Sequence, residues 1–241
     1  MMQRLIIVAV MLVSGFAGCE CAAQDAIGTV SRIQGEASGT RNGATRALAP
    51  NSAVFLNETV ATGETARLEV TFTDNTRLTL GEKAKLTLKN SLDDAKDRLS
   101  WSWTSSAAVP PADFENPVEG ANDYTLCLYD QTGFLLGAAA PAGGVCGTRP
   151  CWKRTGSSSL VYRDKLLDPD GLETVVLKPG ASAGKAKITV KGKGANLALP
   201  GLSLTTPVRV QVLRSMSTCW EATFSAASRN DSEVFKARSD P

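Results

Sequence analysis

The sequence contains no histidine, and this absence excludes several kinds of catalysis at once. A serine or cysteine nucleophile has no imidazole base to activate it, and a metal site that relies on imidazole ligands cannot form. Carboxylates, lysines and thiols are present, but no motif arranges them for a recognisable reaction. The sequence therefore predicts a protein that is not an enzyme and that holds neither a cofactor nor a metal ion.

Net charge and aromatic side chains are also scarce. The chain has 26 Lys and Arg residues against 24 Asp and Glu residues, and only 6% of its residues are aromatic. A formal charge of +2 is too small to steer a polyanion over a long range, so no nucleic-acid partner is predicted. With 21 glycines, 11 prolines and 43% hydrophobic residues, the composition is typical of a chain that buries a core and turns often.

No apolar run is long enough to cross a bilayer. The run from Leu5 to Val13 follows Arg4 and has the layout of a secretory signal. Residues 1–23 are predicted to be a signal peptide that is cleaved after Ala23. The alternative is a bacterial lipobox with lipidation at Cys19, although a phenylalanine stands where that motif usually has an aliphatic residue. Either way of processing the segment predicts an exported protein of the periplasm, the outer-membrane surface or the medium. The mature chain is predicted to have no transmembrane segment. Lipidation at Cys19 would add a lipid anchor.

The cysteines fit an oxidising compartment. Cleavage after Ala23 leaves Cys127, Cys146, Cys151 and Cys219, which is an even set. Four residues separate Cys146 from Cys151, which is neither the spacing of a redox pair nor half of a four-thiolate zinc site. Two disulfides are therefore predicted, Cys146 with Cys151 and Cys127 with Cys219, out of three possible connectivities.

Residues 26–104 show short alternating runs that are broken by turn residues, which predicts antiparallel strands. In the stretches Ala66 to Phe72 and Arg77 to Leu80 the apolar side chains share one face of each strand. Asp74 and Asn75 between them tolerate the left-handed backbone of a tight turn. One face of this predicted hairpin is expected to be buried and the other to be exposed to solvent.

A spaced pattern of small, apolar and acidic residues runs through the same region at Val60, Thr62, Gly63, Ala66, Leu68, Val70, Phe72, Asp74, Leu78, Leu80, Leu86 and Leu88. This pattern resembles the repeated-strand signature of the FecR domain, named after the iron-dicitrate transport regulator. Asn75 stands where that family usually has glycine, and both residues accept a positive φ. The resemblance implies a periplasmic β domain. It does not extend to signalling to a sigma factor, because this chain shows neither the cytoplasmic anti-sigma segment nor the membrane span of the family's regulators.

Residues 105–121 contain three prolines and are predicted to be a linker or an irregular crossing, because proline cannot donate to a sheet. Just before this segment, Trp101 and Trp103 share one face of a predicted strand. They are interpreted as core residues rather than as a platform for a ligand.

Residues 122–241 contain six further alternating runs, which predict a disulfide-stabilised β-sandwich or small barrel. One run carries a row of lysines around two apolar residues, at Lys185, Lys187, Lys191 and Lys193. The favoured interpretation is an edge strand that lysine protects against unwanted pairing, and the alternative is contact with anionic glycans or lipid headgroups.

The sequence as a whole predicts an all-β protein with two domains, a FecR-like domain at residues 26–104 and a second β domain at residues 122–241. By elimination, we expect an exported, non-catalytic binding or structural module that acts on an unknown protein or cell-surface polymer. The alternative is a periplasmic sensing component that passes a FecR-like signal to a separate membrane protein.

Overall fold

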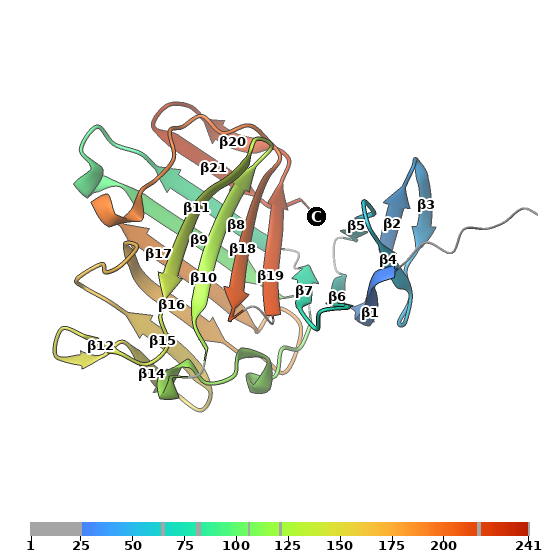
Figure 1. Cartoon of the computed structure of the whole chain (residues 1–241), viewed down its shortest axis with the longest axis horizontal. Coiled ribbons are helices and arrows are strands. Elements are labelled where there is room, and N and C mark those ends of the chain that lie inside the picture. Colours follow the sequence, from blue (N-terminus) through green and yellow to red (C-terminus); the bar gives the residue numbers. More distant parts are fainter. Residues whose placement is uncertain are drawn as a thin grey trace, which may run out of the picture.

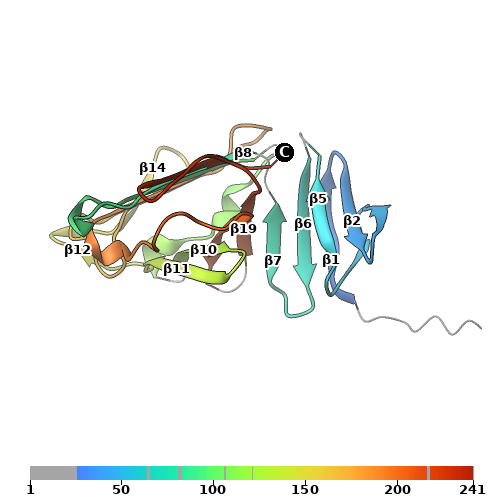
Figure 2. The ribbon, with the colours of Figure 1, turned by 90° about the horizontal axis from the view of Figure 1, so that it is seen from above.

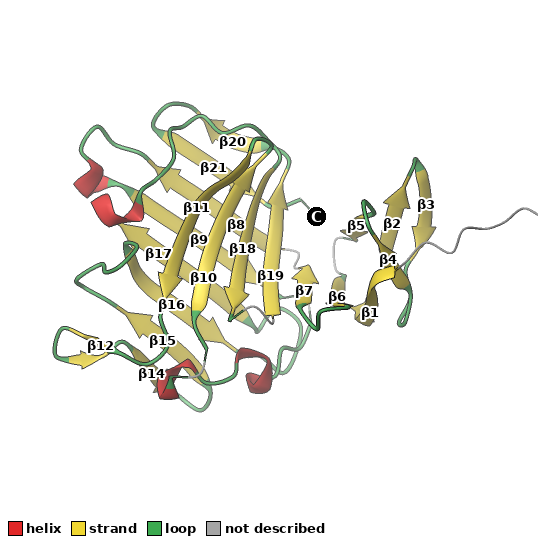
Figure 3. Cartoon of the chain, in the orientation of Figure 1, coloured by secondary structure: helices red, strands yellow, loops and turns green. Residues whose placement is uncertain are grey.

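A computed structural model describes residues 26–240, except residues 64, 65, 81, 82, 106, 121, 216 and 217. Its regular structure consists almost entirely of strands, and the helices of the described part are four single 3₁₀ turns (Figure 3). The all-β prediction is therefore confirmed.

Eight strands form a sheet that we call the joint sheet, because it runs past both hydrophobic cores of the molecule. Their order is β11-β10-β18-β19-β7-β6-β1-β4. Every neighbouring pair is antiparallel except β19 and β7, which are parallel. In sheet order the strands are Gly133–Ala140, Tyr124–Asp130, Val208–Arg214, Thr218–Phe224, Arg77–Leu80, Arg67–Phe72, Ala26–Gln34 and Ala53–Phe55.

A second sheet of eight antiparallel strands, the back sheet, stacks on one half of the joint sheet. Its order is β14-β15-β16-β17-β9-β8-β21-β20. Figure 1 shows it behind β11, β10, β18 and β19, while β7, β6, β1 and β4 extend beyond it. In sheet order its strands are Trp152–Thr155, Ser159–Arg163, Leu172–Lys178, Lys187–Lys193, Arg98–Thr104, Lys83–Lys89, Val234–Arg238 and Ala227–Asn230.

The remaining elements are short. A small sheet of β3 (Ala44–Ala47), β2 (Ala37–Arg41) and β5 (Thr59–Thr62) lies beside the β1 end of the joint sheet (Figure 2). A two-stranded hairpin and the four 3₁₀ turns complete the fold: β12 (Val145–Cys146), β13 (Arg149–Pro150), η1 (Asp94–Lys96), η2 (Pro111–Phe114), η3 (Pro117–Glu119) and η4 (Ala195–Leu197).

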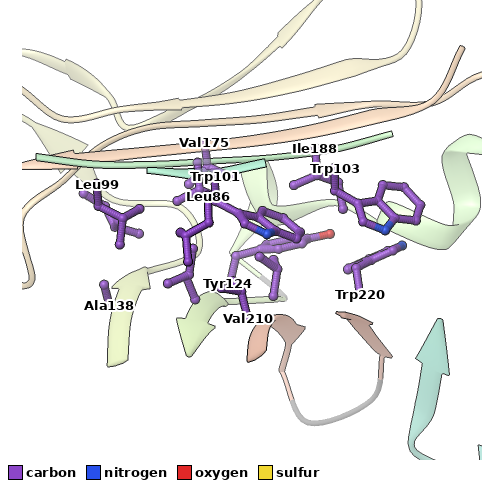
Figure 4. Packing of buried hydrophobic residues seen from close by; sticks show 14 of the residues in the cluster. Leu86, Leu99, Trp101, Trp103, Tyr124, Ala138, Val175, Ile188, Val210 and Trp220 are labelled. Atoms are coloured by element: carbon purple, nitrogen blue, oxygen red, sulfur yellow. The ribbon is translucent and has the colours of Figure 1, made fainter. Parts of the chain in front are cut away.

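The large core fills the space between the back sheet and strands β11, β10, β18 and β19. Alternation along each strand directs every second side chain into it, and Trp101 and Trp103 of β9 are fully buried there. Figure 4 shows both indoles reaching toward Tyr124 and Trp220 of the opposite sheet. The Trp220 ring in turn stacks on Phe114 at a centroid distance of 5.1 Å. The interpretation of the tryptophan pair as core residues is confirmed.

A separate small core lies between the small sheet and strands β1, β4 and β6. It contains Val30, Ala37, Leu48, Val54, Leu68 and Val70. The predicted hairpin is present, and Leu68 and Val70 of β6 are on its buried face. Asn75 has a φ of 65°, and the Asp74 carboxylate accepts a hydrogen bond of 2.9 Å from the Thr76 backbone N–H. The turn therefore uses the left-handed backbone that the sequence predicted.

The predicted boundary at residues 105–121 does not separate the two cores. Strand β9 pairs with β17, and β8 pairs with β21, so residues 83–104 belong to the back sheet and to the large core. The proline-rich segment is itself packed, since Val109 exchanges two backbone hydrogen bonds of 2.8 and 3.0 Å with Gly180 and Phe114 is buried. The boundary between the cores falls between β7 and β8, because alternation identifies a strand but does not say which sheet the strand joins.

Candidate functional site

A cleft of about 920 Å³ lies between the two cores. One wall is the face of β18 and β19 that is turned away from the back sheet. The core-facing residues of β18 are Val208, Val210 and Val212, so the residues between them, Arg209 and Gln211, face the cleft. The other wall comes from β4, β5, β6 and β7. The cleft thus spans the parallel pairing of β7 with β19.

The first wall is polar, and two of its charged groups, Arg209 and Glu221, lie close to each other. Gln211 lies opposite Glu221 on the neighbouring strand, and its Nε2 donates a hydrogen bond of 2.5 Å to Glu221 Oε2. The Arg209 Nε lies 4.0 Å from the same carboxylate oxygen, and its guanidinium lies 4.9 Å from the centre of the Tyr129 ring. Burial raises the pKa of Glu221, while the Gln211 hydrogen bond and Arg209 act in the opposite direction. The Glu221 carboxyl group is therefore largely removed from water, and Gln211 and Arg209 offset part of the cost of that burial.

The second wall is mainly apolar. Val60, Phe72 and Leu78 line it, and these residues are partly buried against the small core. A ligand with one polar end and an apolar body fits such a pair of walls, because each part finds a partner of its own polarity.

Two charged residues, Glu58 and Arg77, also line the second wall, and the Glu58 carboxylate is held by groups of the protein itself. The Glu58 side chain is only 1% exposed. Its oxygens accept hydrogen bonds of 2.9 and 3.0 Å from Arg46 and one of 3.0 Å from the Phe55 backbone N–H. Gly39 leaves room for this carboxylate, because a Cβ there would lie 2.1 Å from Glu58 Oε1. Glu58 is therefore a rigid part of the wall rather than a free base.

The predicted cysteine sites separate into two kinds. Cys146 and Cys151 form a disulfide with a Cα–Cα distance of 4.9 Å. Cys127 and Cys219 are not bonded to each other, contrary to the prediction. Cys127 is on β10 and Cys219 is on β19, and β18 lies between these strands. Two strand spacings amount to roughly 9.5 Å, which is beyond the reach of a disulfide.

Both free thiols lie on the sheet face that carries the cleft, and Cys219 lines it. Burial raises the pKa of both thiols, that of Cys219 to well above its ordinary value of 9.0. They are consequently protonated near neutral pH and poor nucleophiles. The predicted processing sites, Ala23 and the alternative Cys19, lie outside the described residues.

Within the described residues, no group of three or more Cys, Asp or Glu side chains is arranged to hold a metal ion. No helix in that part is both long enough and apolar enough to span a membrane.

Three comparisons with known proteins add no relative. The chain matches no protein-family model, no curated protein and no solved structure. The FecR resemblance stays a prediction that depends on the sequence pattern.

Sequence analysis did not find the residues that line the cleft. The alternation of Val208 to Leu213 is the signal that could have placed Arg209 and Gln211 on the polar face of a strand. What it could not show is that strands from residues 53–80 fold back beside that face. Glu221 was harder still to identify as a cleft residue, because a single acid between apolar residues in a strand usually faces water.

Proposed function

We propose that this chain is an exported, non-catalytic binding module of a bacterial cell envelope, and that its ligand occupies the cleft between the two cores. The secretory layout of residues 1–23 supports export. The Cys146–Cys151 disulfide is compatible with an oxidising compartment. The FecR-like pattern favours an envelope protein by resemblance alone.

The observation that carries the binding role is that two carboxylates of the cleft, Glu58 and Glu221, are held by other side chains of the protein. Glu58 is held by Arg46, and Glu221 is held by Gln211 beside Arg209. Groups that are already satisfied hold a shape and a pattern of polarity, which suits recognition by contact. The Cys219 thiol adds no nucleophile, because burial keeps it protonated.

Photo-cross-linking in living cells tests this role. A photo-reactive amino acid is placed at Thr59, on the β5 side of the cleft, and at Ser157, an exposed turn residue that does not line the cleft. A second protein carries the Thr59 probe together with Thr223→Trp, which fills the cleft from the opposite wall. We expect one defined product from Thr59 that disappears with Thr223→Trp, and no such product from Ser157. Equal products from both sites, or a product that the cleft-filling change leaves intact, would contradict the proposal.

A second candidate function is the sensing component, and the position of the cleft favours it. The two walls lie on opposite sides of the β7–β19 pairing. A ligand that touches both walls would bias the angle between the two parts, as a periplasmic sensor requires. Deleting the gene should then change transcription of a defined set of genes, and restoring the chain with Thr223→Trp should fail to reverse that change. Unchanged transcription would contradict the sensing role, and the binding module would then be the remaining candidate.

A further inference from the structure

The outer face of the back sheet is strongly basic. Its core-facing residues alternate with outward-facing ones, and the outward positions of five adjacent strands are rich in lysine and arginine. We call this surface the basic face. It consists of ten cations: Lys83, Lys85, Lys89, Arg98, Lys178, Lys187, Lys191, Lys193, Lys236 and Arg238.

The net charge of the whole chain conceals this concentration. The chain carries a formal charge of only +2, so a surface with ten cations leaves the rest of the molecule with more carboxylates than cations. Cations that are interspersed with carboxylates along the sequence are therefore concentrated on one face of the folded protein. A field that is negligible for the chain as a whole becomes substantial above this one face.

Several of these cations lie directly opposite one another on paired strands. Lys178 faces Lys187, and Lys85 faces Arg238. Arg98 has a cation on both sides, because it faces Lys193 on β17 and Lys89 on β8. Like charges in such positions destabilise a sheet. A chain that keeps four such pairs on one face maintains them at a cost in stability, which indicates that the face has a use.

Little in the described structure neutralises the face. Glu173 makes an ion pair with Lys193. Arg98 Nη1 donates to the backbone oxygens of Ala95 and Asp97 at 3.4 and 2.7 Å, which leaves its charge in place. Apart from Lys193, which is half-buried, the ten side chains are exposed.

Protection of a sheet edge does not explain the lysine row at Lys185, Lys187, Lys191 and Lys193. Strand β17, which carries most of that row, lies between β16 and β9 in the interior of the back sheet, so the edge interpretation is wrong. In Figure 2 the back sheet is the outer layer of the sandwich, on the side away from β10 and β11. The outward-facing cations are exposed apart from Lys193, so the described part of the chain leaves them uncovered.

We propose that the basic face docks on the surface of an anionic phospholipid membrane, through the phosphate-bearing headgroups. The cations extend both along the strands and across five of them, so they cover an area rather than a line. A planar array of anions neutralises all of them together, whereas a single linear polyanion would follow one row. Each basic side chain near such a surface strengthens binding about fivefold.

The side chains between the cations support a headgroup contact. They are short, mainly serine and threonine with two valines, as at Ser100, Ser102, Thr104, Thr189 and Val176. None of the outward-facing residues on these five strands is aromatic, so the face offers no platform on which sugar rings or nucleic-acid bases would stack. The contact is therefore electrostatic and lies at the level of the headgroups.

Vesicle sedimentation tests the proposal directly. The purified chain is mixed with vesicles of phosphatidylcholine alone and with vesicles that also contain phosphatidylglycerol. A variant with Lys85→Gln, Lys89→Gln and Lys187→Gln removes three exposed cations of the basic face. A matched variant with Arg149→Gln, Arg154→Gln and Lys165→Gln removes three exposed cations elsewhere. Tryptophan fluorescence and thermal unfolding check that both variants fold.

We expect binding only to the phosphatidylglycerol vesicles, a steep decrease of that binding with salt, and a loss of roughly 100-fold in the first variant. The matched variant should keep most of its affinity. Equal binding to both kinds of vesicle, or an equal loss in both variants, would overturn the proposal. Binding to polygalacturonate or duplex DNA without binding to anionic vesicles would also overturn it, because the partner would then be a linear polyanion. The cleft takes no part in this experiment, so its outcome is independent of the proposed function.

Discussion

Glu221 makes the stability of the folded chain depend on pH. Burial raises its pKa above the ordinary value of 4.5, so the folded protein holds this proton more tightly than the unfolded chain does. The stability that the proton contributes is complete below the ordinary pKa and is lost as the pH rises through the raised one.

We therefore expect the native protein to lose free energy of unfolding relative to Glu221→Gln as the pH rises above the ordinary glutamate pKa of 4.5. The glutamine has no proton to lose, and its carbonyl still accepts the hydrogen bond from Gln211. Urea unfolding at a series of pH values measures the difference. Glu119→Gln, at an exposed position, is the control and should follow the native curve. A constant difference between the native protein and Glu221→Gln across the pH series would show that Glu221 does not titrate differently on folding.

Gly39 is needed because of the carboxylate beside it. A methyl group at this position would lie 2.1 Å from Glu58 Oε1, and Glu58 cannot move aside without leaving Arg46 and the Phe55 N–H. We expect Gly39→Ala to destabilise the protein by about 1 to 3 kcal/mol. Adding Glu58→Gln should not restore stability, because the clash remains, whereas Glu58→Ala in the same protein should recover part of it. Denaturant unfolding of the three variants separates these outcomes.

The cysteines predict a definite thiol count. The mature protein should contain one disulfide and two thiols, which react only after denaturation because Cys127 and Cys219 are buried. Replacing Cys146 and Cys151 by alanine opens a short loop and should cost about 2 kcal/mol in the free energy of unfolding. Thiol titration in denaturant and mass spectrometry of unreduced peptides check the count. A peptide that links Cys127 to Cys219 would contradict the strand order.

At the scale of elements, the β7–β19 pair holds the two parts of the joint sheet together. Strand β7 is bonded on both sides, antiparallel to β6 and parallel to β19. Leu78 lies opposite Val70 on one side and Cys219 on the other. A proline at this position removes a backbone donor from the interior of a sheet, at a cost of about 3 kcal/mol.

We expect Leu78→Pro to release the part of the chain that contains the small core while the large core stays folded. Hydrogen exchange followed by mass spectrometry should show lost protection in residues 26–80 and retained protection in β9 and β17. Leu78→Ala keeps the N–H and should have a smaller effect. A uniform loss of protection across both cores would show instead that they unfold as one unit.

The same strands show what the sequence could and could not predict. Alternation predicted the hairpin of β6 and β7, its turn at Asp74 and Asn75, and the burial of Trp101 and Trp103, because each depends on residues close together in the chain. The position of β9 beside β17 depends on a pairing across more than eighty residues, and no local pattern encodes it. The same limit hid the cleft, whose walls come from residues 27–78 and 129–223.

Across the whole molecule, the cleft and the basic face are on opposite sides of the sandwich. The cleft opens on the face of β18 and β19 that is turned away from the back sheet, and the basic face is the outer surface of the back sheet. A chain docked through its basic face would therefore present the cleft away from the membrane, where a ligand reaches it freely. The two proposed contacts are geometrically compatible, and each can be removed without the other.

The crowded cations on the basic face also predict how salt acts on stability. Raising the salt concentration from about 0.01 M to about 0.2 M shortens the Debye length from roughly 30 Å to less than 10 Å and screens the four like-charge pairs. At about 0.2 to 1 kcal/mol for each pair, we expect the native protein to gain about 1 to 2 kcal/mol in the free energy of unfolding.

The variant with Lys85→Gln, Lys89→Gln and Lys187→Gln lacks three of these pairs. It should be more stable than the native protein at low salt and should gain much less as salt is added, while the variant with Arg149→Gln, Arg154→Gln and Lys165→Gln should respond as the native protein does. Urea unfolding at the two salt concentrations measures this, and equal gains in all three proteins would show that the basic face is not under electrostatic strain.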